Sequence, residues 1–271
     1  DKQPIIMRLQ GRITILAAAA AITMASCTGS NNDGNYPIRP VPFTSVKMTD
    51  NFWAPRIQKN HEVTIPIAFG YCESTGRIKN FEIAGGLDTG AFQSIYPFDD
   101  SDVTKIIEGA SYSLQTFPDP DLETYLDTLI YKIGLAQEDD GYLYTNRTIA
   151  EMGYGKIHDW AEGERWGKTN ILSHELYNMG HMYEAAVAHY QATGKRDFLD
   201  IAIKSADLVD KDFGWDAFVS YPGHQVIEMG LVKLYRVTGE KRYLDLAKFF
   251  LDARGTRDDG EEYSQSHMKV V

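Results

Sequence analysis

The stretches that decide the fold are residues 180–202, GHMYEAAVAHYQATGKRDFLDIA, and residues 223–247, GHQVIEMGLVKLYRVTGEKRYLDLA. They carry one pattern twice: a Gly-His pair, a tyrosine, a Thr-Gly pair and an aromatic-Leu-Asp segment. The two Thr-Gly pairs lie 45 residues apart. A repeat of this length, with a glycine turn between helices, is typical of stacked helical hairpins. Because one hairpin cannot bury its apolar face alone, we expect the hairpins to close around a central cleft where the histidines meet.

Apolar residues recur at helical spacing along most of the remaining chain. Helices are predicted over residues 54–74, 103–115, 122–137, 170–192, 196–211, 224–237 and 241–253, and loops over residues 87–97 and 139–166. Thr75-Gly76 is expected to end the first helix in the manner of a Gly C′ cap. Ser101 and Asp102 are expected to cap the second helix, and Asp99 to Asp102 to form a solvated acidic cluster.

These patterns predict an all-α chain, since strand patterns are nearly absent. The hairpins are expected to form part of an (α/α)6 barrel, a toroid of helical hairpins. Seven predicted helices fall short of the twelve that six hairpins need. We therefore expect a barrel truncated before completion, the alternative being a complete open array.

Composition limits the partners of this 271-residue chain, which is 43% hydrophobic and 24% charged, as in an ordinary globular domain. Its formal net charge of −11 argues against nucleic acid as a partner, because phosphate contacts need a basic face. The same charge leaves no polybasic patch for an anionic membrane. The 16 Tyr, 12 Phe and 4 Trp either fill the core or line a carbohydrate cleft.

The first 27 residues have the pattern of a secretion signal with a lipobox, and residues 1–6 are expected to precede the true start. Arg8 and Arg12 precede a short apolar stretch, and Ala-Ser leads into Cys27, the predicted lipidation site. Residues 28–42 are expected to be a flexible tether to a folded part over 43–271. We therefore predict an exported bacterial lipoprotein, periplasmic or on the outer-membrane surface, that touches the membrane only through its lipid anchor. An ordinary cleaved signal or an uncleaved anchor is the alternative.

The only other cysteine, Cys72, lies in a helical pattern and is predicted to be a buried, inert thiol. A lone cysteine excludes a disulfide framework in the exported part.

Four histidines are the candidate substrate-binding residues. His174 and His181 are seven residues apart and share one helix face, a spacing that differs from the i, i+4 pair of a zinc helix. His224 lies at a predicted helix start, and His267 follows a polar segment with a neighbouring tyrosine. Each alone is compatible with a structural role, and the repeated Gly-His pair favours a shared cleft for His181 and His224.

The sequence assigns no catalytic and no metal-binding residues within the chain. Carboxylates are abundant, yet their spacing singles out no pair such as glycoside hydrolysis commonly uses. There is also no glycine-rich phosphate loop, no Cys-Cys metal pair and no nucleophile elbow.

Seven short motifs together resemble the β-L-arabinofuranosidases of glycoside hydrolase family 127. They are FWAPR at 52–56, TGRIKNF at 75–81, DVTKIIEG at 102–109, DGYL at 140–143, HELY at 174–177, AAVAHY at 185–190 and SH at 266–267. The resemblance extends over about residues 40–271 and rests on the order of the motifs as much as on each one.

The resemblance implies an (α/α)6 barrel and the release of non-reducing-end β-L-arabinofuranose, with retention, from plant-type glycans or glycoproteins. It also implies a zinc-bound cysteine thiolate as nucleophile, further Cys and Glu zinc ligands, and a Glu as acid/base. In the family these residues follow the motif matched at His267, so we expect them beyond Val271. Zinc is therefore expected only in the full-length protein, and residues 28–271 alone are expected to be inactive.

The resemblance carries sugar contacts over to His224, to His267 and to either His174 or His181. The substrate is expected to be a carbohydrate, and a homodimer is possible. Two alternatives remain open from the residues themselves: a non-catalytic carbohydrate-binding surface lipoprotein of helical-repeat type, and another six-hairpin barrel enzyme acting through Asp pairs.

Overall fold

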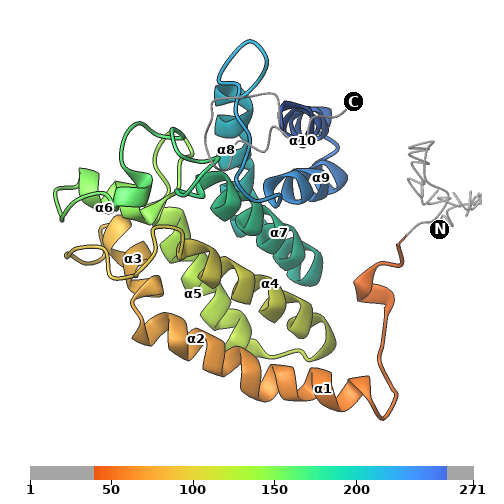
Figure 1. Ribbon diagram of the computed structural model, residues 1–271. Coiled ribbons are helices and arrows are strands. Elements are labelled where there is room, and N and C mark those ends of the chain that lie inside the picture. Colours follow the sequence, from red (N-terminus) through yellow and green to blue (C-terminus); the bar gives the residue numbers. More distant parts are fainter. Residues whose placement is uncertain (1–39, 255–271) are drawn as a thin grey trace, which may run out of the picture. The chain divides into compact units, whose positions relative to one another are not determined.

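The structure is a computed structural model that describes residues 40–254. Helices dominate this part of the chain (Figure 1). They are α1 (Trp53–Lys59), α2 (Ile65–Ser74), α3 (Arg77–Ala84), α4 (Asp100–Thr116), α5 (Pro120–Ala136), α6 (Thr145–Glu151), α7 (Glu175–Thr193), α8 (Asp197–Asp212), α9 (Ile227–Thr238) and α10 (Lys241–Ala253). Between residues 40 and 254 the only β-type pairing is an isolated bridge of Phe213 with Phe218. The all-α prediction is confirmed, while Cys27 and His267 lie outside the described residues.

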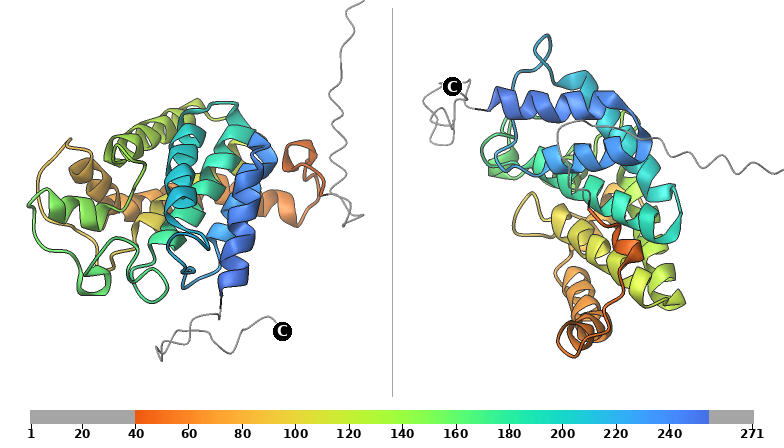
Figure 2. Two further views of the ribbon diagram at one scale, coloured as in Figure 1. Left: turned by 90° about the horizontal axis from the view of Figure 1, so that it is seen from above. Right: turned by 90° about the vertical axis from the view of Figure 1, so that its right-hand side faces the viewer.

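Three successive hairpins form two layers of helices. In the first layer α4 packs against α7 and α7 against α9, and in the second layer α5 packs against α8 and α8 against α10 (Figures 1 and 2). Within each hairpin the two helices also contact one another, as α7 does α8 and α9 does α10. This is the arrangement of consecutive hairpins in part of an α/α barrel, as the repeat predicts.

The Thr-Gly turns of the two repeats have the same geometry. Gly194 and Gly239 end α7 and α9 with φ angles of 77° and 79°, in the left-handed region that favours glycine. In both turns the threonine hydroxyl donates to the carbonyl four residues earlier, Thr193 to His189 O at 2.7 Å and Thr238 to Leu234 O at 2.8 Å. The repeat therefore encodes the hairpin turn itself.

The Gly-His pairs, by contrast, are not equivalent, and that expectation is wrong. Gly180 lies in the second turn of α7, which begins at Glu175 and not near residue 170. Gly223 lies in the loop before α9, which begins at Ile227 and not at residue 224. The two glycines therefore serve different local purposes, and only that of Gly180 concerns helix packing.

Gly180 lets α7 and α9 approach closely. A Cβ at this position would lie 2.5 Å from the backbone N of Ile227 and 2.7 Å from its Cα. On the other side of the crossing, a Cβ at Gly230 would lie 2.8 Å from Gly180 O. Real Cβ atoms do not approach backbone so closely, so both positions need glycine for this packing.

The first predicted helix, 54–74, exists but contains one π-helical turn, Asn60–Thr64, between α1 and α2. It ends as predicted, with Gly76 in the left-handed region at φ 80°. Sequence reasoning missed α3 and α6, which pack against one another and whose buried residues include Ile78, Phe81 and Ile149. Both helices are short, so their periodicity is weak.

The acidic cluster at the start of α4 is not solvated, contrary to expectation. The helix begins at Asp100, before the predicted cap, and Asp99 and Asp100 are each only 4% exposed. Thr145 donates its N–H at 2.9 Å and its hydroxyl at 2.5 Å to the Asp100 carboxylate, and burial raises the Asp100 pKa to about 7. Arg77 pairs with Asp99 at 3.1 Å, so these acids join α4 to α3 and α6.

Cys72 is buried, as predicted, and burial raises the pKa of its thiol to about 11, so the thiol stays protonated at neutral pH. Among the described helices, none is both long and apolar enough to cross a lipid bilayer.

The substitution Gly180→Ala is predicted to lower the free energy of unfolding by about 1–3 kcal/mol, because the added methyl overpacks the α7–α9 crossing. The matched control is Gly109→Ala within α4, where nothing lies within 4 Å of an added Cβ. That change should stabilise by about 0.5–1 kcal/mol, since Ala is the better helix former. Urea unfolding of both variants measures the difference. Equal stability of the two would contradict the close crossing.

Candidate functional site

Three of the four predicted histidines come together around one tyrosine. The His174 and His224 rings lie 4.8 Å apart, centroid to centroid. The Tyr177 ring lies 4.5 Å from His181, 5.6 Å from His224 and 5.8 Å from His174. The structure thus joins residues some fifty positions apart in sequence, and both His174 and His181 belong to the group.

The helix starts explain this meeting. His174 is the N-cap of α7, with φ 55° and ψ 31°, a conformation that is uncommon for a residue with a side chain. Tyr177 and His181 follow it at helical spacing on the same face. His224 lies just before α9, and Gly223 beside it donates its N–H to Thr169 O at 3.0 Å. The site therefore lies at the N-terminal ends of two neighbouring helices.

A lysine from α4 completes the group. Lys105 Nζ donates to the Tyr177 hydroxyl oxygen at 2.7 Å and to Ser101 Oγ at 3.1 Å. Because the ammonium group has no acceptor, the Tyr177 hydroxyl proton must point away from Lys105 and remains free to donate elsewhere. Sequence reasoning missed both residues. The i, i+4 spacing of Tyr177 to His181 on the predicted helix is a signal that places the tyrosine beside the histidines.

The half-buried imidazoles of His174 and His181 are neutral at pH 7. Burial lowers the pKa of His174 to about 4, with a further contribution from His224. Burial also lowers the pKa of His181 to about 4, and the Lys105 ammonium adds to this. In each ring Nδ1 is buried and has no protein partner. A neutral imidazole donates at one nitrogen and accepts at the other, which suits the vicinal hydroxyls of a sugar.

The sequence profile of the β-L-arabinofuranosidase catalytic domain of glycoside hydrolase family 127 matches residues 45–271. This chain belongs to glycoside hydrolase family 127. The motifs that carried the resemblance, among them HELY at 174–177, supply two of the rings that meet at the site.

The relatives that this chain matches are longer than the chain itself. A non-reducing-end β-L-arabinofuranosidase of Bifidobacterium longum subsp. longum is 36% identical over 232 residues, 78% of this chain and 34% of that protein. A solved family 127 β-arabinofuranosidase is 55% identical, with a TM-score of 0.77, over 86% of this chain and 36% of its own. The β-L-arabinofuranosidase of Geobacillus stearothermophilus T6 is 39% identical, with a TM-score of 0.72, over 82% of this chain and 34% of its own. This chain thus spans about a third of the length of these relatives.

The carboxylate next to His174 in this family 127 chain has a structural role. Glu175 is 1% exposed and accepts hydrogen bonds from Tyr142 OH at 2.6 Å, Trp166 N at 3.1 Å and Ser173 Oγ at 2.7 Å. These bonds tie the buried carboxylate to the loop that leads into α7. Glu175 therefore fixes the start of α7, directly after His174.

The described residues do not fit the zinc site that the family implies. Between residues 40 and 254, no three His, Cys, Asp or Glu side chains lie close enough together to hold a metal ion. The Lys105 ammonium contacts Tyr177 beside the histidines, and the Cys72 thiol holds its proton at neutral pH.

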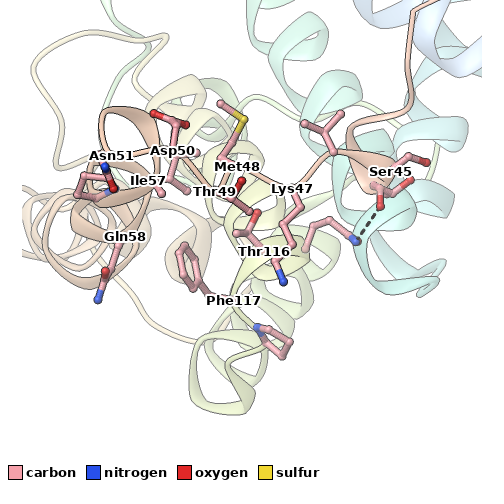
Figure 3. A pocket seen from close by; sticks show the side chains of 16 residues that line it. Ser45, Lys47, Met48, Thr49, Asp50, Asn51, Ile57, Gln58, Thr116 and Phe117 are labelled. Atoms are coloured by element: carbon pink, nitrogen blue, oxygen red, sulfur yellow. Dashed lines mark hydrogen bonds between the residues drawn. The ribbon is translucent and has the colours of Figure 1, made fainter.

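A cavity of about 780 Å³ lies in another part of the chain than the group of histidines (Figure 3). It is lined by residues 44–51, parts of α1 and residues 115–118, and none of its lining residues is a histidine. Residues 115–118 end α4, whereas Lys105 lies near its start, and a 17-residue helix is about 25 Å long. This cavity is therefore separate from the group of histidines.

Histidine titration tests the electrostatics of the site. The ring signals of His174 and His181, assigned through His174→Gln and His181→Gln, are predicted to titrate near pH 4 in the NMR spectrum. Because both pKa values lie below that of an unfolded histidine, about 6.5, the unfolded chain binds more protons between these values. The free energy of unfolding should therefore fall as pH is lowered from about 6.5 to about 4. Midpoints near pH 6.5 for both rings would show that they are not desolvated.

Proposed function

We propose that this chain forms the sugar-binding part of a β-L-arabinofuranosidase. In this proposal His174, Tyr177 and His224 hold a non-reducing-end β-L-arabinofuranose. The observation that carries it is the meeting of these three rings, from α7 and from the loop before α9, at one end of the first helix layer. The activities named for the family 127 relatives support the choice of sugar.

The chemistry of the group suits a small polyol. A terminal arabinofuranose has free hydroxyls at C2, C3 and C5, each able to donate and to accept. The neutral His174 ring has an unpaired buried Nδ1, and exposed His224 offers a second imidazole beside it. The Tyr177 hydroxyl, held at its oxygen by Lys105, supplies a directed donor. Such a mix of donors and acceptors matches hydroxyl groups, each of which can both donate and accept.

The remaining parts of the proposal rest on the sequence and the family. We propose retaining hydrolysis by the family's zinc-bound thiolate, carried out by residues other than those described, on plant-type glycans or glycoproteins. Export as a lipoprotein anchored at Cys27, to the periplasm or the outer-membrane surface, is proposed from the signal pattern over residues 1–27. His267 is proposed as a further sugar contact from its motif alone, and a homodimer stays possible.

In the full-length protein, His174→Ala and His224→Ala are each predicted to weaken arabinofuranoside binding by about 1–3 kcal/mol, roughly 5- to 150-fold, because each leaves sugar hydroxyls unpaired. KM and kcat for an aryl β-L-arabinofuranoside measure this loss. The control is Gln191→Ala, an exposed position near the far end of α7. If both histidine variants behave like this control, the sugar does not bind here.

A chain limited to residues 28–271 distinguishes binding from chemistry. It is predicted to release no arabinose, whereas the full-length protein should. Turnover by residues 28–271 would place the nucleophile within this part. A full-length protein that binds arabinose but hydrolyses no arabinofuranoside would favour the alternative, a non-catalytic carbohydrate-binding lipoprotein.

A further inference from the structure

Three aromatic side chains form an offset stack next to the histidines. The rings of Tyr96 and Phe98 lie 5.4 Å apart with planes 6° from parallel, and those of Tyr96 and Trp160 lie 5.4 Å apart at 19°. Phe98 and Trp160 lie 6.3 Å apart at 13°. Phe98 also meets His174 edge-on, with centroids 4.7 Å apart. The aromatic stack is therefore continuous with the proposed sugar site.

Polar contacts hold the two loops that carry the stack. Tyr96 and Phe98 precede α4, where Asp99 accepts from Tyr96 N at 3.4 Å and pairs with Arg77. Trp160 lies in the short 3-10 helix Asp159–Ala161, whose start is capped by His158 Nδ1 accepting from Trp160 N at 3.1 Å. These contacts hold the backbone of both loops in place without a ligand, and the rings stack on one another, so the stack is preorganised.

A second set of contacts anchors the Trp160 loop from below. Asn146 of α6, only 2% exposed, accepts from His158 N at 3.1 Å through its side-chain oxygen. Lys168 Nζ donates to Asp159 O at 2.9 Å. The loop is thus tied to α6 and to the segment that leads into His174.

The stack is not part of the hydrophobic core. Tyr96 is 43% exposed and its neighbour Ile95 is 75% exposed, while Phe98 and Trp160 are partly buried. A solvated ion pair lies at the rim, Lys156 Nζ to Asp159 Oδ1 at 3.4 Å. Partly exposed rings with charged neighbours are typical of a surface that binds an amphipathic ligand. A sugar ring is such a ligand: its C–H face packs on the negative face of an aromatic ring, and its hydroxyls reach polar side chains.

We propose that Tyr96, Phe98 and Trp160 form a subsite for the leaving-group sugar, the residue to which the terminal arabinofuranose is attached. This inference rests on the proposed function, since the terminal sugar must lie at His174 and His224 for its neighbour to reach the stack. The occupant is a pentose or similar sugar ring in glycosidic linkage, stacked by its C–H face. The subsite accounts for recognition of glycan chains beyond the sugar that is released.

The test compares two substrates in the full-length protein: an arabinofuranosyl disaccharide, which fills the subsite, and methyl β-L-arabinofuranoside, which does not. Trp160→Ala and Tyr96→Ala should each lower kcat/KM for the disaccharide about 10-fold and leave the methyl glycoside within about 2-fold of wild type. Tyr131→Ala is the matched control, because Tyr131 is 63% exposed on α5 and should affect neither substrate. Circular dichroism checks that each variant is folded. If Trp160→Ala does not fold, Tyr96→Ala alone carries the test.

Equal losses on both substrates, or no loss on either, would overturn the subsite while leaving the arabinofuranosidase proposal standing. A wild-type protein that hydrolyses neither substrate would overturn the proposed function, and this inference with it. The wild-type result alone thus decides the proposed function, and the variants decide the subsite.

Discussion

The close crossing of α7 and α9 at Gly180 and Gly230 is the constraint on which the site depends. Two helices that each lack a Cβ at their contact approach until backbone meets backbone. This sets the start of α9 against the first turns of α7, so that His224, just before α9, lies beside His174, just before α7. A wider crossing would separate the two imidazoles and leave no shared site. The close packing of α7 on α9 therefore brings the two imidazoles together.

Burial then decides what these side chains can do. The pKa of His174 and of His181 is lowered because desolvation disfavours the charged ring, and each keeps one buried nitrogen without a protein partner. Lys105 retains the only charge in direct contact with Tyr177 among the described residues, and its hydrogen bond orients the tyrosine hydroxyl. Neutral imidazoles beside an oriented hydroxyl can both donate to and accept from the hydroxyl groups of a sugar. The aromatic stack that continues from His174 adds a face for a second sugar ring.

The sequence predicted the features that depend on local physics. Thr193-Gly194 and Thr238-Gly239 form the turns expected of them, because glycine alone adopts the left-handed conformation without strain. The longer helices were found from their apolar periodicity. The sequence also offered His174, His181 and His224 as candidate substrate-binding residues and left open which of the first two joins the site, and its reasoning from the repeated Gly-His pair was wrong. Gly180 lies within a helix and Gly223 in a loop, so the two glycines differ in position and in role. Gly180 permits a close helix crossing, which no local sequence pattern reveals.

Features that depend on tertiary packing could not be predicted from local patterns in the sequence. Asp99 and Asp100 look like a solvated cap in sequence, and only the approach of α3 and α6 buries them against Arg77 and Thr145. Tyr177 and Lys105 lie in quoted motifs, yet their contact joins α7 to α4 across 72 positions of sequence. Phe98 and Trp160 come from separate loops. Such pairs follow from the assembled layers and not from spacing along one helix.

A crystal structure of the full-length protein with L-arabinose bound tests the central claim most directly. The account predicts density for one pentose between His174, Tyr177 and His224, at the N-terminal ends of α7 and α9. Density for the pentose in the cavity between residues 44–51 and the end of α4, with the three rings untouched, would contradict it.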